Sequence, residues 1–105
     1  MKDENLLSVL ETFGLSINEA KTYLALLKLG QSKVNEISNK SQILRETTYG
    51  LINSLMQKGL VNYIIKSGVR YFEAVNPIKL KAILKEKQSQ LDNILPYLNR
   101  LEKCS

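Results

Sequence analysis

The chain has 105 residues, one cysteine, no histidine and a formal net charge of +5. This length fits one domain with its own hydrophobic core, but not a catalytic domain together with a regulatory one. Without histidine, and with Cys104 as the only thiol, the sequence lacks the usual ligands of a metal site and a Ser/His or Cys/His nucleophile pair. We therefore expect neither an enzyme nor a protein that holds a metal or another cofactor.

The positive charge lies in the later parts of the chain. Residues 1–30 have a net charge of −1, whereas residues 31–75 and 76–105 each have +3. The N-terminus lacks the apolar core of a signal peptide, and no apolar run approaches the length of a membrane span. We therefore expect a cytoplasmic protein without a membrane partner. For Cys104 we expect a solvated thiol, with a disulfide between two copies as the alternative.

Two helices are predicted at the start of the chain. The first has apolar residues at helical spacing and stops at Gly14; they are Leu6, Leu7, Leu10 and Phe13. A capping box of Ser16 and Glu19 opens the second helix, which runs to Gly30. Its predicted apolar face consists of Ala20, Tyr23, Leu24 and Leu27. Nothing polar converges on this face, so we interpret it as scaffold.

A short helix followed by a longer one is predicted next. Ser32 is the expected N-cap of a helix over residues 32–39, with Val34 and Ile37 pointing inward, and residues 40–43 form the connector. The longer helix covers Arg45 to Lys58. Its inner face combines Thr48, Leu51, Ile52 and Leu55, and its outer face combines Glu46, Gly50, Asn53 and Gln57. The outer face is small, polar and almost free of acid.

A β-hairpin is predicted after Gly59, which supplies a left-handed helix cap, and Leu60, which returns to the core. Residues 61–65 and 69–74 are rich in β-branched and aromatic residues, and Lys66, Ser67 and Gly68 join them. Helix, tight turn, helix and hairpin follow one another in the winged helix-turn-helix order. In such a fold Lys66 and Arg70 would lie along phosphates or in the minor groove; the alternative is that Arg70 only flanks a solvent-facing strand.

A long helix is predicted to start at Asn76 and Pro77. Its heptad positions are Leu80, Leu84, Lys87, Leu91, Ile94, Leu98 and Leu101. A narrow apolar seam on a helix that extends beyond a complete small domain favours pairing with a second copy, although Lys87 and Pro96 interrupt it. The alternative is that the helix folds back on Leu6, Leu10 and the second helix. We therefore divide the chain into a winged helix at residues 1–76 and a coiled-coil dimerisation segment at residues 77–105.

The ordered set of motifs resembles the N-terminal domain of the TrmB-like transcriptional regulators, a mostly archaeal family. It comprises Phe13-Gly14-Leu15-Ser16, Glu19-Ala20-Lys21, Tyr23 to Leu27, Leu29-Gly30, Glu36-Ile37, Arg45, Tyr49, Leu55, Lys58 to Val61, Arg70-Tyr71, Pro77 and Leu95-Pro96-Tyr97-Leu98. The match covers about Leu6 to Leu101. The resemblance implies a dimeric winged-helix regulator whose Arg45, Thr47 and Tyr49 face DNA.

Three features depart from that family pattern. Gln42 stands where such turns commonly have glycine, and Leu44 where the family often has proline. Many longer relatives carry a sugar-binding effector domain after the coil, and this sequence stops there. We expect either a short form or a piece of a longer protein, and we predict no effector from these residues.

The leading hypothesis is therefore a mainly helical winged helix-turn-helix protein that binds double-stranded DNA as a homodimer. The predicted DNA contacts are Lys33, Lys40, Arg45, Glu46, Thr47, Tyr49, Gly50, Asn53, Lys66 and Arg70; the predicted dimer contacts are Leu80, Leu84, Leu91, Ile94, Leu98 and Leu101. Arg45 would read guanine, Asn53 an adenine edge, and Thr47 a thymine methyl group or a phosphate. Lys33 and Lys40 would contact phosphates.

We have more specific expectations for three further residues of the helix predicted over Arg45 to Lys58. Tyr49 either packs or gives its hydroxyl to a phosphate, Gly50 allows close approach of the backbone, and Glu46 either accepts from cytosine N4 or holds Arg45 in place. Two other functions stay open: a winged-helix module that binds a protein of the transcription machinery, and an architectural protein that binds DNA without a preferred site.

Overall fold

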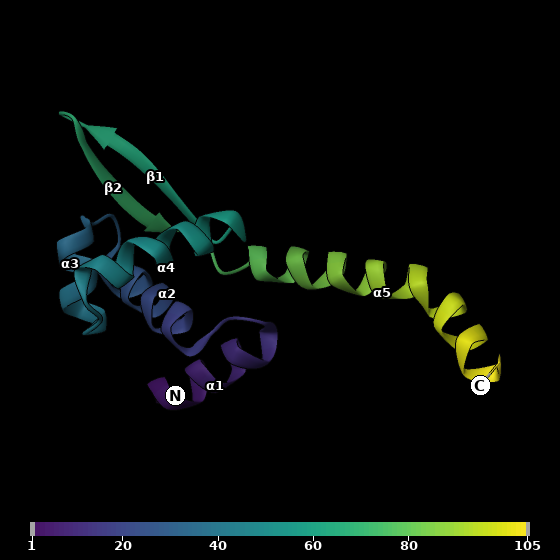
Figure 1. Ribbon diagram of the computed structural model, residues 1–105. Helices are drawn as coiled ribbons and strands as arrows, with labels where there is room; N and C mark the ends of the chain where they lie inside the picture. Colours follow the sequence, from purple (N-terminus) through teal and green to yellow (C-terminus); the bar gives the residue numbers. More distant parts are fainter. Residues whose placement is uncertain (1, 105) are drawn as a thin grey trace.

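Helices and one hairpin follow each other in the predicted order (Figure 1). The computed structural model describes residues 2–104, with the side chain of Cys104 left out, so the expectation for that thiol lies outside the described residues. The elements are α1 (Asp3–Phe13), α2 (Ile17–Leu29), α3 (Val34–Ser41), α4 (Arg45–Gln57), β1 (Val61–Lys66), β2 (Val69–Ala74) and α5 (Lys79–Cys104). A mainly α fold with a small hairpin is confirmed.

The scaffold is centred on α2, which contacts α1, α3, α4 and β2. The predicted capping box is present: Ser16 Oγ accepts from Glu19 N at 3.1 Å, and Ser16 N donates to Glu19 Oε1 at 2.8 Å. Ala20 and Tyr23 are buried as predicted, but Leu27 is exposed and Leu26 lies in the core instead. Residues 24–27 are all apolar, so periodicity alone could not fix which of them faces inward.

The start of α3 differs from the prediction. Ser32 is not its N-cap; the residue is buried in an isolated antiparallel bridge to Phe72 of β2. Ser32 N donates to Phe72 O at 3.0 Å, and Phe72 N donates to Ser32 O at 2.8 Å. The helix begins at Val34, where Lys33 N donates to Glu36 Oε1 at 3.0 Å. The connector is correspondingly shifted to residues 42–44, and Gln42 has a φ of 59°, the left-handed conformation that glycine commonly provides in such turns.

The long polar helix and the hairpin agree closely with the prediction. Thr48, Ile52 and Leu55 of α4 are buried, and Leu51 is half-buried. The outward-facing residues Glu46, Gly50, Asn53 and Gln57 are all exposed. The strands pair from Val61 with Ala74 to Lys66 with Val69, so Lys66 ends β1 instead of lying in the turn. Ser67 and Gly68 both have positive φ, at 50° and 76°, as a tight two-residue hairpin turn requires.

The last helix leaves the domain and extends away from it (Figure 1). Asn76 Oδ1 accepts from Ile78 N at 3.0 Å, and α5 begins at Lys79, two residues after Pro77. Leu80 and Ile83 pack against the core of their own winged helix. The other predicted seam residues are exposed by 45% to 68%; they are Leu84, Leu91, Ile94, Leu98 and Leu101. The fold-back alternative is therefore wrong for this part of the helix.

Two residues that interrupt the seam have distinct structural effects. Lys87 turns toward α1: its Nζ donates to Phe13 O at 3.0 Å and lies 5.0 Å from the centre of the Phe13 ring. Pro96 lies inside α5, where its ring removes one backbone hydrogen bond. Figure 1 shows that the yellow C-terminal part of the helix turns away from the axis of the rest, as expected for a proline kink.

A charged network ties α2 to the end of α4. Glu19 is 6% exposed, and both of its carboxylate oxygens lie 2.8 Å from Lys58 Nζ. Ser54 Oγ also donates to this carboxylate. Burial alone would raise the pKa of Glu19, but the hydrogen bonds from Lys58, Ser16 and Ser54 outweigh it and lower the pKa from 4.5 to about 2. The charged carboxylate is thus part of the folded state.

We expect Glu19→Gln to lower the free energy of unfolding by about 2 kcal/mol at pH 7. Because the folded pKa is depressed, the contribution of the carboxylate is complete above pH 4.5 and is lost as the pH falls through about 2. Urea denaturation of parent and variant at several pH values measures this. The exposed Glu11→Gln is the control, and a difference that stays constant down to pH 2 would contradict the assignment.

Candidate nucleic-acid interface

A basic cavity lies between α3, α4 and the hairpin. Its volume is about 420 Å³. It is lined by Lys33, Val34, Asn35, Arg45, Tyr49, Ile52, Asn53, Gly68, Val69, Arg70 and Phe72. Three of these residues carry a positive charge, and within residues 2–104 no carboxylate lines the cavity. Such a surface suits a polyanion that also carries flat groups with hydrogen-bond donors and acceptors at their edges.

Arg45, the first residue of α4, is held in place by two neighbours. Its Nε donates to Asn35 Oδ1 at 2.5 Å, and its Nη2 donates to Tyr49 Oη at 2.8 Å. The guanidinium carbon lies 5.0 Å from the centre of the Tyr49 ring. Tyr49 remains 42% exposed. Its hydroxyl accepts from Arg45 and keeps its own hydrogen for a further acceptor.

The basic residues of the hairpin lie over aromatic rings. The Arg70 guanidinium is 4.7 Å from the centre of the Tyr63 ring. Lys66 Nζ is 5.4 Å from the centre of the Tyr71 ring and donates to Gln31 Oε1 at 2.8 Å. Such contacts position a cation without neutralising it. The positive charges therefore remain available along the hairpin.

The structure brings together five of the predicted DNA-contact residues and separates the others. Lys33, Arg45, Tyr49, Asn53 and Arg70 line the cavity. Outside its lining, Glu46, Thr47 and Gly50 are exposed on α4, and Lys66 lies at the end of β1.

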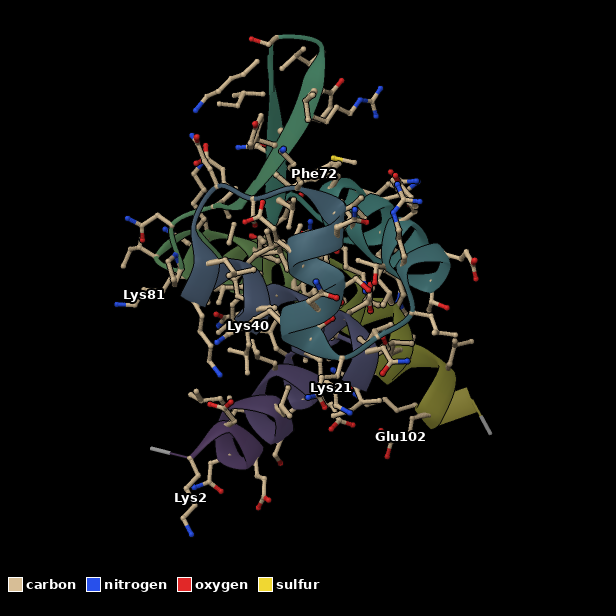
Figure 2. All side chains as sticks on the ribbon, turned by 90° about the vertical axis from the view of Figure 1, so that its left-hand side faces the viewer. Lys2, Lys21, Lys40, Phe72, Lys81 and Glu102 are labelled. Atoms are coloured by element: carbon tan, nitrogen blue, oxygen red, sulfur yellow. The ribbon has the colours of Figure 1, made fainter. Side chains whose placement is uncertain are left out.

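Lys40 occupies a different part of the surface. Figure 2 shows it beside α3, well below the hairpin and on the same side as Lys21. Lys40, Lys21 and Lys28 line a separate hollow of about 320 Å³ between α1, α2 and the end of α3. Lys40 is therefore not grouped with Arg45 and Arg70.

Sequence reasoning did not predict the contacts of three side chains that organise this surface: Gln31, Asn35 and Tyr71. Two amines lie near the Tyr71 ring, because Lys33 Nζ is 5.7 Å and Lys66 Nζ 5.4 Å from its centre. Asn35 contacts Arg45, 10 residues away, and Gln31 contacts Lys66, 35 residues away. Hydrophobic periodicity does not predict contacts between different elements. Of the two roles expected for Glu46, that of holding Arg45 is filled by Asn35 and Tyr49.

Other kinds of site find no support in the described part of the chain. Among the side chains that the structure describes, those of residues 2–103, no group of three or more acidic residues is placed to hold a metal ion. None of the helices described is both long and apolar enough to cross a membrane. The basic cavity is therefore the main candidate for function.

Comparison with known proteins places this arrangement in a family. Residues 10–78, more than half of the chain, match the family described as sugar-specific transcriptional regulator TrmB. The chain belongs to the TrmB family. A curated relative, the HTH-type sugar sensing transcriptional regulator TrmBL1 of Pyrococcus furiosus, is 36% identical over 95 residues, which are 90% of this chain and 28% of that protein. An uncharacterized protein of Methanocaldococcus jannaschii is 31% identical over 96 residues, 86% of this chain and 73% of that protein.

Solved structures show the same fold. The structure of TrmBL2, described as an archaeal chromatin protein with a novel mode of DNA binding, aligns with a TM-score of 0.84 and 22% identity over 98% of this chain and 40% of that one. A MarR family protein from Bacillus stearothermophilus aligns with a TM-score of 0.61 and 20% identity, over 96% of this chain and 77% of that one. The winged-helix fold is confirmed. The chain spans less than half the length of TrmBL1 and TrmBL2, and the regulators that it matches are not enzymes.

Gly50 has no structural reason to be glycine. It lies inside α4, and a Cβ atom there would meet nothing within 4 Å. Because glycine inside a helix is less favourable than alanine, we expect Gly50→Ala to stabilise the fold by about 0.5–1 kcal/mol. We expect the same change to weaken binding of duplex DNA, since the added methyl group prevents close approach. Urea denaturation and fluorescence anisotropy measure the two effects.

Gln57→Ala, on the same face of α4 but near its far end, is the control for Gly50→Ala. A Gly50→Ala variant that is more stable and binds DNA as tightly as the parent would contradict the assignment of Gly50 to the interface.

Proposed function

We propose that this TrmB-family chain is a sequence-specific regulator of transcription that binds double-stranded DNA as a homodimer. In this proposal α4 enters the major groove, and the hairpin lies on the backbone or in the minor groove. The observation that carries it is the basic cavity between α3, α4 and the hairpin, which holds three cations and, in the part of the chain described, has no acidic lining residue. Phosphate contacts supply affinity, and the exposed polar face of α4 supplies sequence preference.

The exposed residues of α4 have chemically distinct tasks in this proposal. Arg45 reads guanine, Asn53 pairs with an adenine edge, and Thr47 contacts a thymine methyl group or a phosphate. Tyr49 gives its remaining hydroxyl hydrogen to a phosphate oxygen, and Glu46 accepts from cytosine N4. Lys33 and Arg70, which line the cavity, contact phosphates, as does Lys66 at the end of β1. Lys40, in the separate hollow, contacts a phosphate outside the cavity.

The apolar stripe of α5 supports a homodimer. Five large aliphatic side chains at heptad positions are exposed on a helix that extends from the domain; they are Leu84, Leu91, Ile94, Leu98 and Leu101. Burying such a stripe against the same stripe of a second copy removes apolar surface from water, and two-fold symmetry follows. Two α4 helices would then reach successive major grooves about 34 Å apart. Leu80 sits closer to its own core and contributes least.

Selection of duplexes from a random pool by the purified protein, at near-physiological salt, tests the proposal. A two-fold symmetric motif with half-sites one helical turn apart is the expected result. Retention without a motif would support the architectural function instead. Failure to retain duplexes would overturn the DNA-binding proposal and favour a protein partner. Salt dependence separates these cases, because binding through several phosphates weakens steeply as salt rises.

Two substitutions separate base reading from phosphate contact. We expect Arg45→Ala to cost about 1–3 kcal/mol on the selected site and to relax the preference at one base pair. We expect Lys66→Ala to weaken binding to every sequence alike and to lower the slope of log K against log salt by about one unit. Anisotropy titrations at several salt concentrations measure both. An Arg45→Ala variant that binds every sequence like the parent would refute the base-reading assignment.

Interruption of the stripe on α5 tests the dimer. We expect the double variant Leu91→Glu and Ile94→Glu to be a monomer in sedimentation equilibrium, because two buried carboxylates would oppose pairing. Its affinity for the two-fold site should fall by roughly 100-fold, while its affinity for a half-site stays unchanged. Asn93→Glu, which adds a charge outside the seam, is the control. A double variant that remains dimeric would show that another surface pairs the copies.

A further inference from the structure

Arg45 is joined to α3 across the helix-turn-helix connector. Asn35 lies in the first turn of α3 and Arg45 is the first residue of α4, and the 2.5 Å bond from Arg45 Nε to Asn35 Oδ1 links them. Tyr49, one turn further along α4, holds the same guanidinium through its hydroxyl and its ring. All three side chains line the basic cavity.

This contact contributes little to the stability of the fold. Asn35, Arg45 and Tyr49 are all exposed, and hydrogen bonds between exposed side chains stabilise a protein only weakly. Arginine has a long, flexible side chain, however, and ordering it on binding opposes association. A guanidinium that is already ordered in the free protein loses little further conformational entropy when it binds. The contact therefore matters for recognition more than for folding.

The donors that remain on Arg45 indicate what it can read. A guanidinium has five N–H donors; Asn35 takes the one on Nε, and Tyr49 takes one of the two on Nη2. Both Nη1 donors and the second Nη2 donor remain. If Tyr49 accepts the Nη2 hydrogen on the same side as Nε, one hydrogen from each Nη nitrogen remains at the end of the planar group, and these two parallel donors match the O6 and N7 acceptors of guanine.

We propose that Asn35 is a positioning residue for base reading: with Tyr49, it fixes the guanidinium of Arg45 so that the end of the group faces the major-groove edge of one guanine. This inference rests on the proposed function and adds to it a residue that touches no base itself. It predicts that loss of Asn35 reduces discrimination at the guanine read by Arg45, whereas the number of phosphate contacts stays the same.

The test uses the selected duplex and a second duplex in which 7-deazaguanine replaces the guanine whose preference Arg45→Ala loses. This analogue keeps base pairing but removes the N7 acceptor. We expect the full-length parent to bind the modified duplex at least ~10-fold more weakly than the unmodified one. For Asn35→Ala we expect this ratio to fall to about 3 or less, with an unchanged salt slope and an unchanged midpoint of thermal unfolding.

Asn39→Ala is the matched control, because Asn39 is an exposed asparagine one turn further along α3; it should keep the ratio of the parent. Tyr49→Phe removes the other acceptor but keeps the ring, and should give an intermediate ratio. If Asn35→Ala discriminates like the parent, the positioning assignment for Asn35 is overturned while the proposed function stands. A parent without a preferred sequence would overturn both.

Discussion

Two backbone hydrogen bonds between Ser32 and Phe72 fix the hairpin against the start of α3. Backbone bonds of this kind leave little freedom, because both residues are buried. Side chains alternate between the two faces of a strand, so anchoring Phe72 in the core also determines the face on which Arg70 lies. Lys33 follows Ser32 and Tyr71 precedes Phe72, and Lys33 Nζ lies 5.7 Å from the centre of the Tyr71 ring. The backbone thus fixes where the hairpin lies relative to the start of α3.

The molecule holds its cations in two different ways. In the scaffold, Lys58 and Lys28 pair with the carboxylates of Glu19 and Asp3. Around the cavity, Lys33, Arg45, Lys66 and Arg70 lie instead over the rings of tyrosines. A carboxylate cancels a charge, whereas an aromatic face orients it and leaves its field intact. The cations around the cavity are therefore oriented without loss of charge, which suits a polyanion.

Local patterns in the sequence sufficed for most of the fold. The Ser16 and Glu19 capping box and the left-handed Gly59 are short-range features, and both were predictable. Ser32 was misassigned because its partner, Phe72, lies forty residues further along the chain. The exposed polar face of α4 followed from helical phase, but the bond between Asn35 and Arg45 depends on how sharply the connector turns. That geometry comes from the left-handed Gln42, a conformation that non-glycine residues adopt only rarely.

The contact of Lys87 with α1 determines how the long helix leaves the domain. It is a hydrogen bond between α5 and the winged helix, and a cavity of about 280 Å³, lined partly by Phe13, Ile83 and Lys87, lies beside it. About 17 residues of α5 follow Lys87, an arm that measures roughly 26 Å along the helix at 1.5 Å per residue and bends at Pro96. A tilt of ~10° at this joint would move the far end of such an arm by about 4–5 Å. A pair of copies joined through these arms would therefore tolerate operators whose half-sites differ slightly in spacing, with the joint absorbing the difference.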